Sequence, residues 1–252
     1  TMKLSSLNKS LQIISLLSEN QRGLSLTEIS ETLGYPMSTV HHILSTFVPD
    51  DYVTQDPRTK EYSLGFGFLK ISKKILDNID LRRAAHDHLV ELSEKCDETV
   101  HLYILRKGMA AAVDMIPKKS GLSLASYVGF TAEPHPSSAG KTLLSGLSNE
   151  HVIGLYKDRP LKRYGKNTIT NISDLLAELE NIRKLGYAID NEEYYEGIRC
   201  VATPVRQGAS NKIGAAISIT GSIFSMTMER INRELIGMAK ETAQKISAKM
   251  VW

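Results

Sequence analysis

The stretch from Ser25 to Phe47 most restricts the fold of this chain. Ser25 and Glu28 have the spacing of a capping box, in which each residue satisfies a backbone donor of the other at a helix start. Gly34 can adopt the left-handed conformation that ends a helix, and Pro36 stands where a new helix can begin without losing a needed donor. The second helix has apolar residues at helical spacing, namely Val40, Ile43, Leu44 and Phe47. These signals predict two short helices that meet through a tight turn.

The flanking segments complete this unit on both sides. An earlier helix is predicted from four apolar residues at helical spacing, Leu7, Leu11, Ile14 and Leu17. After Pro49, two extended runs, DYVTQD and KEYSLG, flank Pro57 and Arg58 and indicate a hairpin. Three helices followed by a hairpin predict a winged helix-turn-helix domain over residues 1–65. Because helix-turn-helix units most often bind DNA, we predict a DNA-binding domain. The alternative is a small helical domain that binds protein.

The predicted DNA contacts lie on the third helix and on the hairpin. In a winged helix, the third helix enters the major groove and the hairpin approaches the phosphates. The residues predicted to face DNA are Ser38, Thr39, His41, His42 and Ser45 on the helix and Arg58 and Lys60 on the hairpin. The whole chain carries a net charge of +3, but residues 1–70 hold six Lys or Arg against seven Asp or Glu. The phosphate affinity of one domain is therefore expected to be modest, which predicts a homodimer.

Beyond residue 65, the sequence predicts a linker helix and an α+β domain. The linker helix is expected over residues 66–80, which contain no Pro and no Gly/Ser-rich tract, and the C-terminal domain over residues 81–252. The predicted strands are HLYILRKG, MAAAVDMI, LSLASYV, GYAID, IRCVATPV and KIGAAISIT. The predicted helices span residues 81–96, 137–147, 149–156, 172–185 and 226–249. Strands in hairpins with helices grouped before and after them predict an antiparallel sheet flanked by helices.

Composition narrows the class of protein further. The 252 residues are 42% hydrophobic and 23% charged, which is enough for two modest domains. Cys96 and Cys200 are far apart, so no disulfide framework or zinc motif is predicted, and a reducing, cytoplasmic location is expected. Polar residues interrupt residues 1–17, which argues against a secretory or membrane segment there. No cofactor or metal is predicted. Four acidic residues that could imitate a metal cluster are interpreted as a solvated loop: Asp190, Glu192, Glu193 and Glu196.

The motif HPSSAGKTLL, residues 135–144, allows three interpretations. Its Gly140-Lys141 pair resembles the end of a phosphate-binding loop, but such a loop needs Gly at the position of His135. Ser138 and Lys141 have the S-x-x-K spacing of some serine acyl-transfer enzymes, although the S-D-N and K-T-G elements of those enzymes are missing. The third interpretation is a ligand pocket where a loop of small residues enters a helix N-terminus and favours a carboxylate or phosphate. In that case Lys141 is a helix-surface or salt-bridging residue whose loss is mild.

Five segments together resemble the IclR family of bacterial transcription regulators. They are LTEISETLGYPMSTVHHIL, the hairpin end YSLG, PHPSSAGKTLL, IRKLGYAIDNEEYYEGIRCVATPV and AAISITG. The resemblance covers nearly the whole chain, and the fixed order of the motifs makes it more specific than any one of them. It implies an N-terminal winged helix and a C-terminal GAF-like effector domain, assembled as a homodimer or homotetramer. A small organic acid, aromatic compound or sugar-derived metabolite is then expected to shift the affinity for an operator.

The resemblance also implies which residues form the effector pocket. These are Ser138 and Ala139 from the helix-entry motif, Asp190 from GYAID, Ile198 and Cys200 from IRCVA, and Ser218 and Thr220 from AISIT. Strand alternation is consistent with this set, because Ile198 and Cys200 share one face of a strand, as do Ser218 and Thr220. Hydroxyl groups suit the oxygen atoms of a ligand, and the apolar contacts suit a short carbon frame.

The sequence departs from the family pattern at three positions. Family members often have Lys or Arg where Met37 and His42 stand, which puts phosphate contacts by the third helix in question. They often have Gly or Ala where Ser138 stands, so a more polar effector site is expected. Two functional classes remain open at this point. One is a DNA-binding regulator without catalysis, and the other is a metabolite-binding protein or a Ser/Lys acyl-transfer enzyme whose helix-turn-helix contacts protein.

Overall fold

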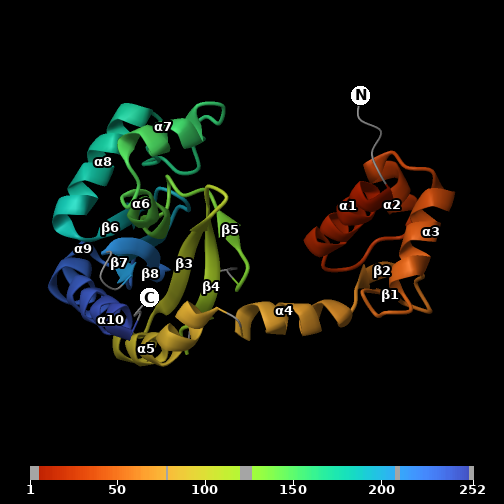
Figure 1. Cartoon of the computed structure of the whole chain (residues 1–252), viewed down its shortest axis with the longest axis horizontal. Coiled ribbons are helices and arrows are strands. Elements are labelled where there is room, and N and C mark those ends of the chain that lie inside the picture. Colours follow the sequence, from red (N-terminus) through yellow and green to blue (C-terminus); the bar gives the residue numbers. More distant parts are fainter. Residues whose placement is uncertain (1–5, 78, 120–126, 208–210, 250–252) are drawn as a thin grey trace. The chain divides into compact units, whose positions relative to one another are not determined.

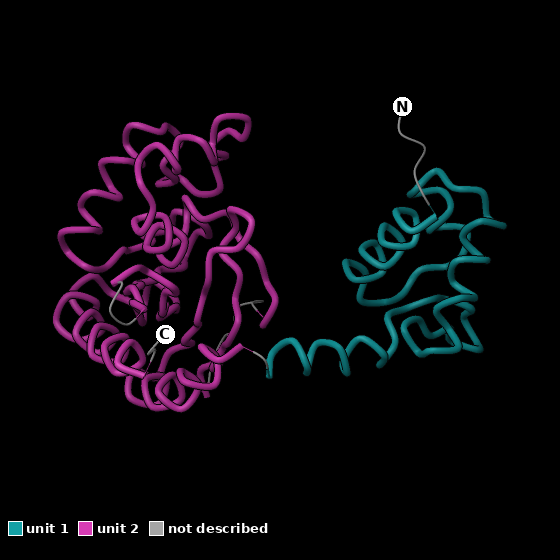
Figure 2. The backbone as a smooth tube through the Cα atoms, viewed as in Figure 1, with its two compact units in different colours: residues 1–78 teal, residues 79–252 magenta. Residues whose placement is uncertain are grey.

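A computed structural model describes residues 6–77, 79–119, 127–207 and 211–249 of the chain. The backbone forms two compact units, residues 1–78 and residues 79–252, which are coloured separately in Figure 2. The division falls inside the region predicted as a linker helix. None of the described helices is long and apolar enough to cross a membrane. Each unit has a hydrophobic core of its own.

The first unit is a winged helix-turn-helix, as predicted (Figure 1). Its elements are α1 (Ser6–Glu19), α2 (Leu26–Leu33), α3 (Met37–Phe47), β1 (Val53–Gln55), β2 (Tyr62–Leu64) and α4 (Gly67–Asp77). The capping box forms: Ser25 N–H donates to Glu28 Oε2 at 2.7 Å, and Glu28 N–H donates to Ser25 Oγ at 3.3 Å. Gly34 ends α2 with a φ of 67°, in the left-handed region that favours glycine. Strands β1 and β2 pair antiparallel and form the wing.

The core of this unit is shared by helices α1, α2 and α3 and the wing. Its buried residues are Ile13, Leu17, Ile29, Val40, Ile43, Leu44, Val53 and Tyr62. The stripe predicted for α1 was wrong in part, because Leu7 and Leu11 are exposed and Ile14 is only partly buried. Leu17 is buried as predicted, and Ile13, four residues before it, completes the buried face in place of Leu7 and Leu11.

Helix α4 is attached to the wing at its first turn. Gly67 N–H donates to the carbonyl oxygen of Asp51 at 2.7 Å, and a Cβ atom at Gly67 would lie 2.9 Å from that oxygen, closer than side chains tolerate. The Phe68 ring contacts Tyr52 edge-on, with 5.1 Å between the ring centroids. The helix predicted over residues 66–80 is therefore observed as Gly67–Asp77, with a new helix beginning at Asp80.

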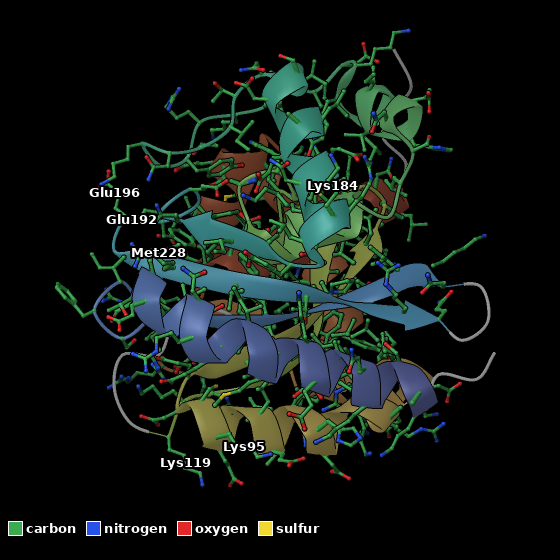
Figure 3. The ribbon with its side chains drawn as sticks, turned by 90° about the vertical axis from the view of Figure 1, so that its left-hand side faces the viewer. Lys95, Lys119, Lys184, Glu192, Glu196 and Met228 are labelled. Atoms are coloured by element: carbon green, nitrogen blue, oxygen red, sulfur yellow. The ribbon has the colours of Figure 1, made fainter. Side chains whose placement is uncertain are left out.

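The second unit is an α+β sandwich built on one six-stranded antiparallel sheet. The strands are β3 (Thr99–Arg106), β4 (Met109–Ile116), β5 (Thr131–Ala132), β6 (Ala188–Asn191), β7 (Ile198–Gln207) and β8 (Lys212–Ser222), in the order β5-β4-β3-β8-β7-β6. The helices are α5 (Asp80–Cys96), α6 (Ser138–Leu144), α7 (Asn149–Tyr156), α8 (Ile172–Leu185), α9 (Met228–Arg230) and α10 (Ile236–Lys249), with a π-helical segment, η2 (Ile231–Leu235), before α10. Figure 3 shows α5 and α10 on one side of the sheet and α8 on the other.

The two faces of the central strands differ in polarity. On β3 and β8 the residues that pack with α5 and α10 are Val100, Leu102, Ile217 and Ile219, all fully buried. The alternate residues on these strands face α6, and they include His101 and Ser218. Because side chains of a strand alternate between its faces, the sheet has one apolar face toward α5 and α10 and a second face, toward α6, that carries polar side chains as well. The polar face carries the candidate site.

Several predicted elements differ in extent from the observed ones, and three of the differences follow here. The closing helix was predicted to start at residue 226 without interruption, whereas Thr227 Oγ1 accepts from Arg230 N–H and caps a helix that begins at Met228. The helix predicted over residues 137–147 spans Ser138–Leu144, because Ser137 is its cap. The strand predicted at LSLASYV lies mostly outside the described residues, and Tyr127 and Val128 at its end are not in a strand.

Candidate functional site

Helix α3 presents a polar face to solvent. Ser38, His41, His42 and Ser45 are exposed, whereas Thr39 is half-buried. The buried residues of the same helix, Val40, Ile43 and Leu44, fix its rotation against α1 and α2. Ser45 Oγ donates to the carbonyl oxygen of His41 at 2.8 Å, so the hydrogen of this hydroxyl is already used in a bond within the helix. Of the five residues predicted for the helix, Ser38, His41 and His42 are the most available to a base edge.

The tip of the wing is ordered by an aspartate. Asp56 Oδ1 accepts from the backbone N–H groups of Arg58 at 2.7 Å and of Thr59 at 2.9 Å. This turn leaves the side chains of Arg58 and Lys60 exposed, as expected for residues that approach phosphate. Met37, where a basic residue is common in the family pattern, is also exposed at the start of α3. The helix and the wing thus present few cations, in line with the charge count of this part of the sequence.

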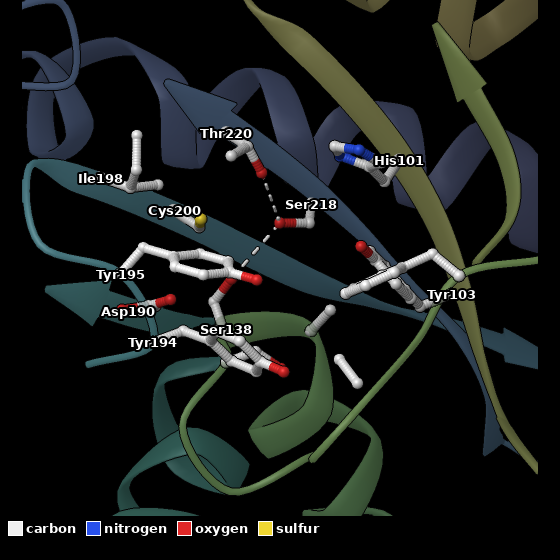
Figure 4. Close-up of a pocket in the computed structure, with 14 residues that line it drawn as sticks. His101, Tyr103, Ser138, Asp190, Tyr194, Tyr195, Ile198, Cys200, Ser218 and Thr220 are labelled. Atoms are coloured by element: carbon white, nitrogen blue, oxygen red, sulfur yellow. Dashed lines mark hydrogen bonds between the residues drawn. The ribbon is translucent and has the colours of Figure 1, made fainter. Parts of the chain in front are cut away.

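The second unit contains a cavity of about 390 Å³ between the polar face of the sheet and α6 (Figure 4). All seven residues predicted for the effector pocket line this one cavity: Ser138, Ala139, Asp190, Ile198, Cys200, Ser218 and Thr220. Sequence reasoning missed seven further lining residues, which are His101, Tyr103, Phe130, Ala132, Ser137, Tyr194 and Tyr195. Period-two alternation in the segment HLY could have indicated His101 and Tyr103, because they share a face of their strand.

Strand register explains why distant residues meet in this cavity. Asp190 on β6 pairs with Cys200 on β7, and Cys200 pairs with Thr220 on β8. Two residues before Thr220 on the same strand, Ser218 pairs with His101 on β3. Residues directly opposite one another in an antiparallel sheet point to the same face, so these five side chains form a continuous polar row.

Three hydroxyl groups form a ladder across the floor of the cavity. Ser138 Oγ lies 3.3 Å from Ser218 Oγ, which lies 3.4 Å from Thr220 Oγ1 (Figure 4). Each hydroxyl can both donate and accept, so the ladder can match a ligand's donors or acceptors by rotating its hydrogens. Gly140 makes this arrangement possible, since a Cβ atom there would collide with the backbone of Pro134 and push α6 away from the loop. The glycine of the Gly-Lys pair therefore serves close packing.

Tyrosine rings form the opposite wall. Tyr194 and Tyr195 follow β6 and lie with 4.7 Å between their ring centroids, and Tyr164 stacks on Tyr194 at 4.8 Å. Tyr103 reaches the cavity from β3, and Figure 4 shows its ring across from Tyr194 and Tyr195. Burial raises the pKa of Tyr194 to about 12, so its hydroxyl is neutral near neutral pH. The wall can offer flat faces and neutral hydroxyl groups to a ligand.

Two other ionisable groups that line the cavity are also uncharged. Burial lowers the pKa of His101 to about 4, so its imidazole is neutral near neutral pH. Burial also raises the pKa of the Cys200 thiol well above its usual range, with a further contribution from Asp190. A thiol with a raised pKa is a poor nucleophile, so Cys200 serves packing here.

The acidic loop after β6 is not solvated as predicted. Asp190 and Glu193 are buried, with exposed fractions of 2% and 7%, whereas Glu196 is exposed. Figure 3 shows Glu192 and Glu196 at the surface of the unit. Asp190 Oδ1 accepts from Glu193 N–H at 2.7 Å, which folds the loop back under the cavity. Among the described residues, no group of three or more His, Cys, Asp or Glu side chains is arranged to hold a metal ion.

The prediction of a surface position for Lys141 was also wrong. Lys141 is 1% exposed, and its Nζ atom donates to Glu193 Oε1 at 2.6 Å, to the carbonyl oxygen of Ile189 at 2.8 Å and to Glu178 Oε1 at 3.4 Å. A lysine ammonium has three donors, and all three are used in this way. No lone pair is left to take a proton from Ser138, whose hydroxyl bonds with Ser218 instead. The alternative prediction, a salt-bridging role, describes Lys141 correctly.

Two protein-family models match the chain, one in its N-terminal part and one in its C-terminal part. A family model described as the IclR helix-turn-helix domain matches residues 6–57, and one described as the bacterial transcriptional regulator IclR C-terminal matches residues 73–248. The chain belongs to the IclR family. The resemblance inferred from five sequence segments is thereby confirmed.

Several IclR-family proteins are similar to the chain over most of its length. The HTH-type transcriptional regulator KdgR of Escherichia coli (strain K12) is 32% identical over 246 residues, which cover 98% of this chain and 92% of KdgR. The HTH-type transcriptional regulator XynR of the same strain is 31% identical over 239 residues, which cover 95% and 93% of the two chains. The crystal structure of the Thermotoga maritima IclR superposes with a TM-score of 0.82 at 30% identity, covering 98% of this chain and 99% of the other. The chain is thus a DNA-binding regulator of transcription.

Proposed function

We propose that this IclR-family regulator binds a small organic ligand in the cavity beside α6 and that the ligand changes its affinity for an operator. One observation carries the proposal: seven residues chosen from four separate sequence segments line a single cavity. Ligand sites are concave, largely apolar and equipped with a few convergent polar groups, which describes this cavity. An IclR homolog of Microbacterium hydrocarbonoxydans was crystallised with 4-hydroxybenzoate; at 18% identity and a TM-score of 0.79, it shares the fold with this chain.

For the DNA contacts, we propose base readout by α3 and phosphate contact by the wing. Ser38, His41 and His42 are exposed on α3 and can donate or accept hydrogen bonds at base edges. Arg58 and Lys60 on the wing supply charge for the phosphates, while Thr39 and Ser45 have secondary roles. The relatives include proteins named as repressors, such as AllR of Escherichia coli (strain K12). We propose repression for this chain as well.

We further propose that the chain is not an enzyme. The S-x-x-K spacing is the feature that suggested acyl transfer, and Lys141 is occupied by three acceptors. An acyl-transfer site also needs a nucleophile that a substrate can reach beside a general base. Ser138 has no such base within the hydrogen bonds of the described residues. The relatives that are named as regulators support the same conclusion.

The proposal is tested in three steps that do not require the operator sequence. A duplex selected by the protein from a random-sequence pool serves as the probe, with an unselected duplex as the control at the same salt concentration. Small carboxylates, phenols and sugar derivatives are then screened by thermal shift, because a ligand that binds the folded state raises its melting temperature. Each ligand found is titrated against the selected duplex. A ligand that raises the melting temperature without changing DNA affinity would contradict the regulatory role.

A further inference from the structure

Helix α3 carries no permanent charge. Its eleven residues, Met37–Phe47, include no Asp, Glu, Lys or Arg, and its titratable side chains are the histidines His41 and His42. Residues 1–70 add no excess of cations, since they hold six Lys or Arg against seven Asp or Glu. DNA binding depends on protein cations that replace the counterions of the phosphates. The helix that we propose to read DNA therefore gains positive charge only when a histidine is protonated.

Both histidines lie on the solvent-facing side of α3. His41 and His42 are exposed. Ser38 and Ser45 are exposed as well and lie three or four residues away, so the four side chains share one face of the helix. Within the described residues, no hydrogen bond or ion pair involves the imidazole of either histidine. Both rings are therefore open to DNA.

The charged groups around α3 are of both signs. The helix shares its core with α1, α2 and the wing. On α1, on α2 and in the loop between them, the charged side chains are Lys9, Glu19, Arg22, Glu28 and Glu31. Between α3 and the end of the wing, they are Asp50, Asp51, Asp56, Arg58, Lys60 and Glu61. Ordinary Asp, Glu, Lys and Arg side chains keep their charge between pH 6 and pH 8, so histidine is the side chain whose charge changes in that range.

We propose that His41 and His42 bind operator DNA as imidazolium cations, so that DNA binding takes up protons and weakens as pH rises. The inference rests on the proposed function, because it takes α3 to be the helix that reads DNA. A protonated imidazole donates from both ring nitrogens, whereas a neutral one donates from one and accepts at the other. Two donors match the acceptors N7 and O6 of guanine in the major groove. The negative charge of the phosphates in turn favours the protonated ring.

Proton uptake has two measurable consequences. By linkage, each proton taken up on binding weakens the affinity by up to about tenfold for each unit by which pH rises. Each cation brought to duplex DNA also steepens the slope of log affinity against log salt concentration by about 0.9. Two histidines should therefore make this slope steeper at pH 6 than at pH 8 by about 1–2. Rings that bind in the neutral form would give an affinity that is constant or rises with pH.

The experiment measures the affinity of the full chain for the duplex that it selects from the random-sequence pool. Fluorescence anisotropy is recorded at pH 6, 7 and 8 and at several salt concentrations. We expect the parent chain to bind at least tenfold more weakly at pH 8 than at pH 6.

Three variants identify the source of the pH dependence. His41→Gln/His42→Gln keeps amides that donate and accept but cannot be protonated, so its affinity should change less than twofold from pH 6 to pH 8. His42→Arg supplies a permanent cation, so it should lose less affinity over this range than the parent chain. His151→Gln, at an exposed position on α7 in the second unit, is the matched control and should follow the parent chain.

The glutamine variant separates the two histidines from other titrating groups. Burial raises the pKa of Asp190 in the second unit to about 7, so this group also changes charge in the range measured. A pH dependence that persists in the glutamine variant would come from such a group and would overturn the inference. An affinity of the parent chain that is constant or rises with pH would overturn it as well.

Failure of the inference is distinct from failure of the proposed function. A glutamine variant with altered base preference, beside a parent chain without pH dependence, would leave α3 as the reading helix and remove only the proton uptake. Absence of sequence-selective binding at every pH would contradict the proposed function itself. If the glutamine variant does not fold or binds too weakly to measure, the salt slopes of the parent chain decide, and equal slopes at pH 6 and pH 8 would overturn the inference.

Discussion

Lys141 Nζ and Glu193 Oε1 are 2.6 Å apart beneath the cavity of the second unit, and both side chains are buried. The pair connects α6, whose first residue lines the cavity, to the loop that carries Tyr194 and Tyr195. Lys141 also donates to the carbonyl oxygen of Ile189 in β6. One side chain therefore fixes a helix, a strand and a loop relative to one another. The shape of the cavity depends on this connection.

Loss of Lys141 should be severe. Lys141→Met leaves the Glu193 carboxylate buried without its cation, and breaking a buried pair in this way typically costs about 3–5 kcal/mol of unfolding free energy. Denaturation in urea measures this cost, with the exposed Lys184→Met on α8 as the control. A loss below about 1 kcal/mol, as for a surface pair, would contradict the buried arrangement.

A second substitution should restore part of that stability. In the double variant Lys141→Met/Glu193→Gln, no charge remains in the broken pair, so the unfolding free energy should recover relative to Lys141→Met alone. The two single variants and the double variant form a cycle that gives the coupling energy of the pair. Strictly additive losses would indicate that the two residues do not interact.

Asp190 should make the protein less stable as pH rises. Its pKa is raised by folding from 3.8 to about 7, so the folded state holds the proton more tightly than the unfolded state. That contribution is fully present below the unfolded pKa and is lost as pH rises through the folded pKa. Asp190→Asn cannot ionise, so its stability relative to the parent chain should increase by about 2 kcal/mol between pH 5 and pH 8. Melting curves of both proteins at these pH values test this, and a constant difference would contradict it.

Local sequence signals predicted most of the elements correctly. The capping box of Ser25 and Glu28 and the left-handed Gly34 are decided by residues within one turn of the helix end. Strand alternation also placed Ile198 and Cys200 on one face of their strand, and Ser218 and Thr220 on one face of theirs, and all four line the cavity. Such features depend on neighbours in sequence, so they can be inferred without knowing the tertiary contacts.

The environment of single side chains could not be inferred in this way. Lys141 and Glu193 are 52 residues apart and meet only because β6 and its loop pass beneath α6. The exposed Leu7 and buried Ile13 of α1 lie on different faces of the helix, and which face is buried depends on contacts with Tyr62 of the wing. Burial of charge is a property of the assembled sheet and helices. Periodicity within one segment carries no information about it.

We expect α3 to read the bases of the operator and the wing to contact its phosphates. Replacing His41 and His42 together by Ala should cost about 1–3 kcal/mol for each base that is no longer read, at particular operator positions. Arg58→Ala should weaken binding to all sequences evenly and reduce the salt dependence of the affinity. Fluorescence anisotropy with the selected duplex and single-base variants separates the two effects. Unchanged base preference in the histidine variant would exclude α3 as the reading element.

The chain should assemble at least as a homodimer. The first unit has no net positive charge, so two copies on a pseudo-palindromic site are needed for useful affinity. Ile71 and Ile75 are exposed on α4 and, four residues apart, share one of its faces. Light scattering should find a dimer, and the variant Ile71→Glu/Ile75→Glu should dissociate it, whereas Ser72→Glu should not. A monomer both free and on DNA would contradict the prediction.

Filling the cavity should separate ligand response from DNA binding. Ser138→Trp places a large ring among Ser218 and the tyrosine wall, where a ligand would lie, while α3 and the wing belong to the other unit. DNA affinity should persist, and the change in affinity caused by a ligand should fall, because a ligand shifts an equilibrium only through its differential affinity for the two states. Ser173→Trp, at an exposed position on α8, is the control.

A second, smaller substitution tests the same assignment in case Ser138→Trp does not fold. Ser138→Ala removes only the hydroxyl that bonds with Ser218, so it should weaken the ligand by about 0.5–1.5 kcal/mol and leave the fold unchanged. Both variants are titrated with the same ligand and the same duplex beside the parent chain. An unchanged ligand response in both would defeat the assignment of the cavity. Covalent labelling of Ser138 by an acylating reagent, lost in Lys141→Met, would instead support the acyl-transfer enzyme, because that result requires Lys141 to act as a base.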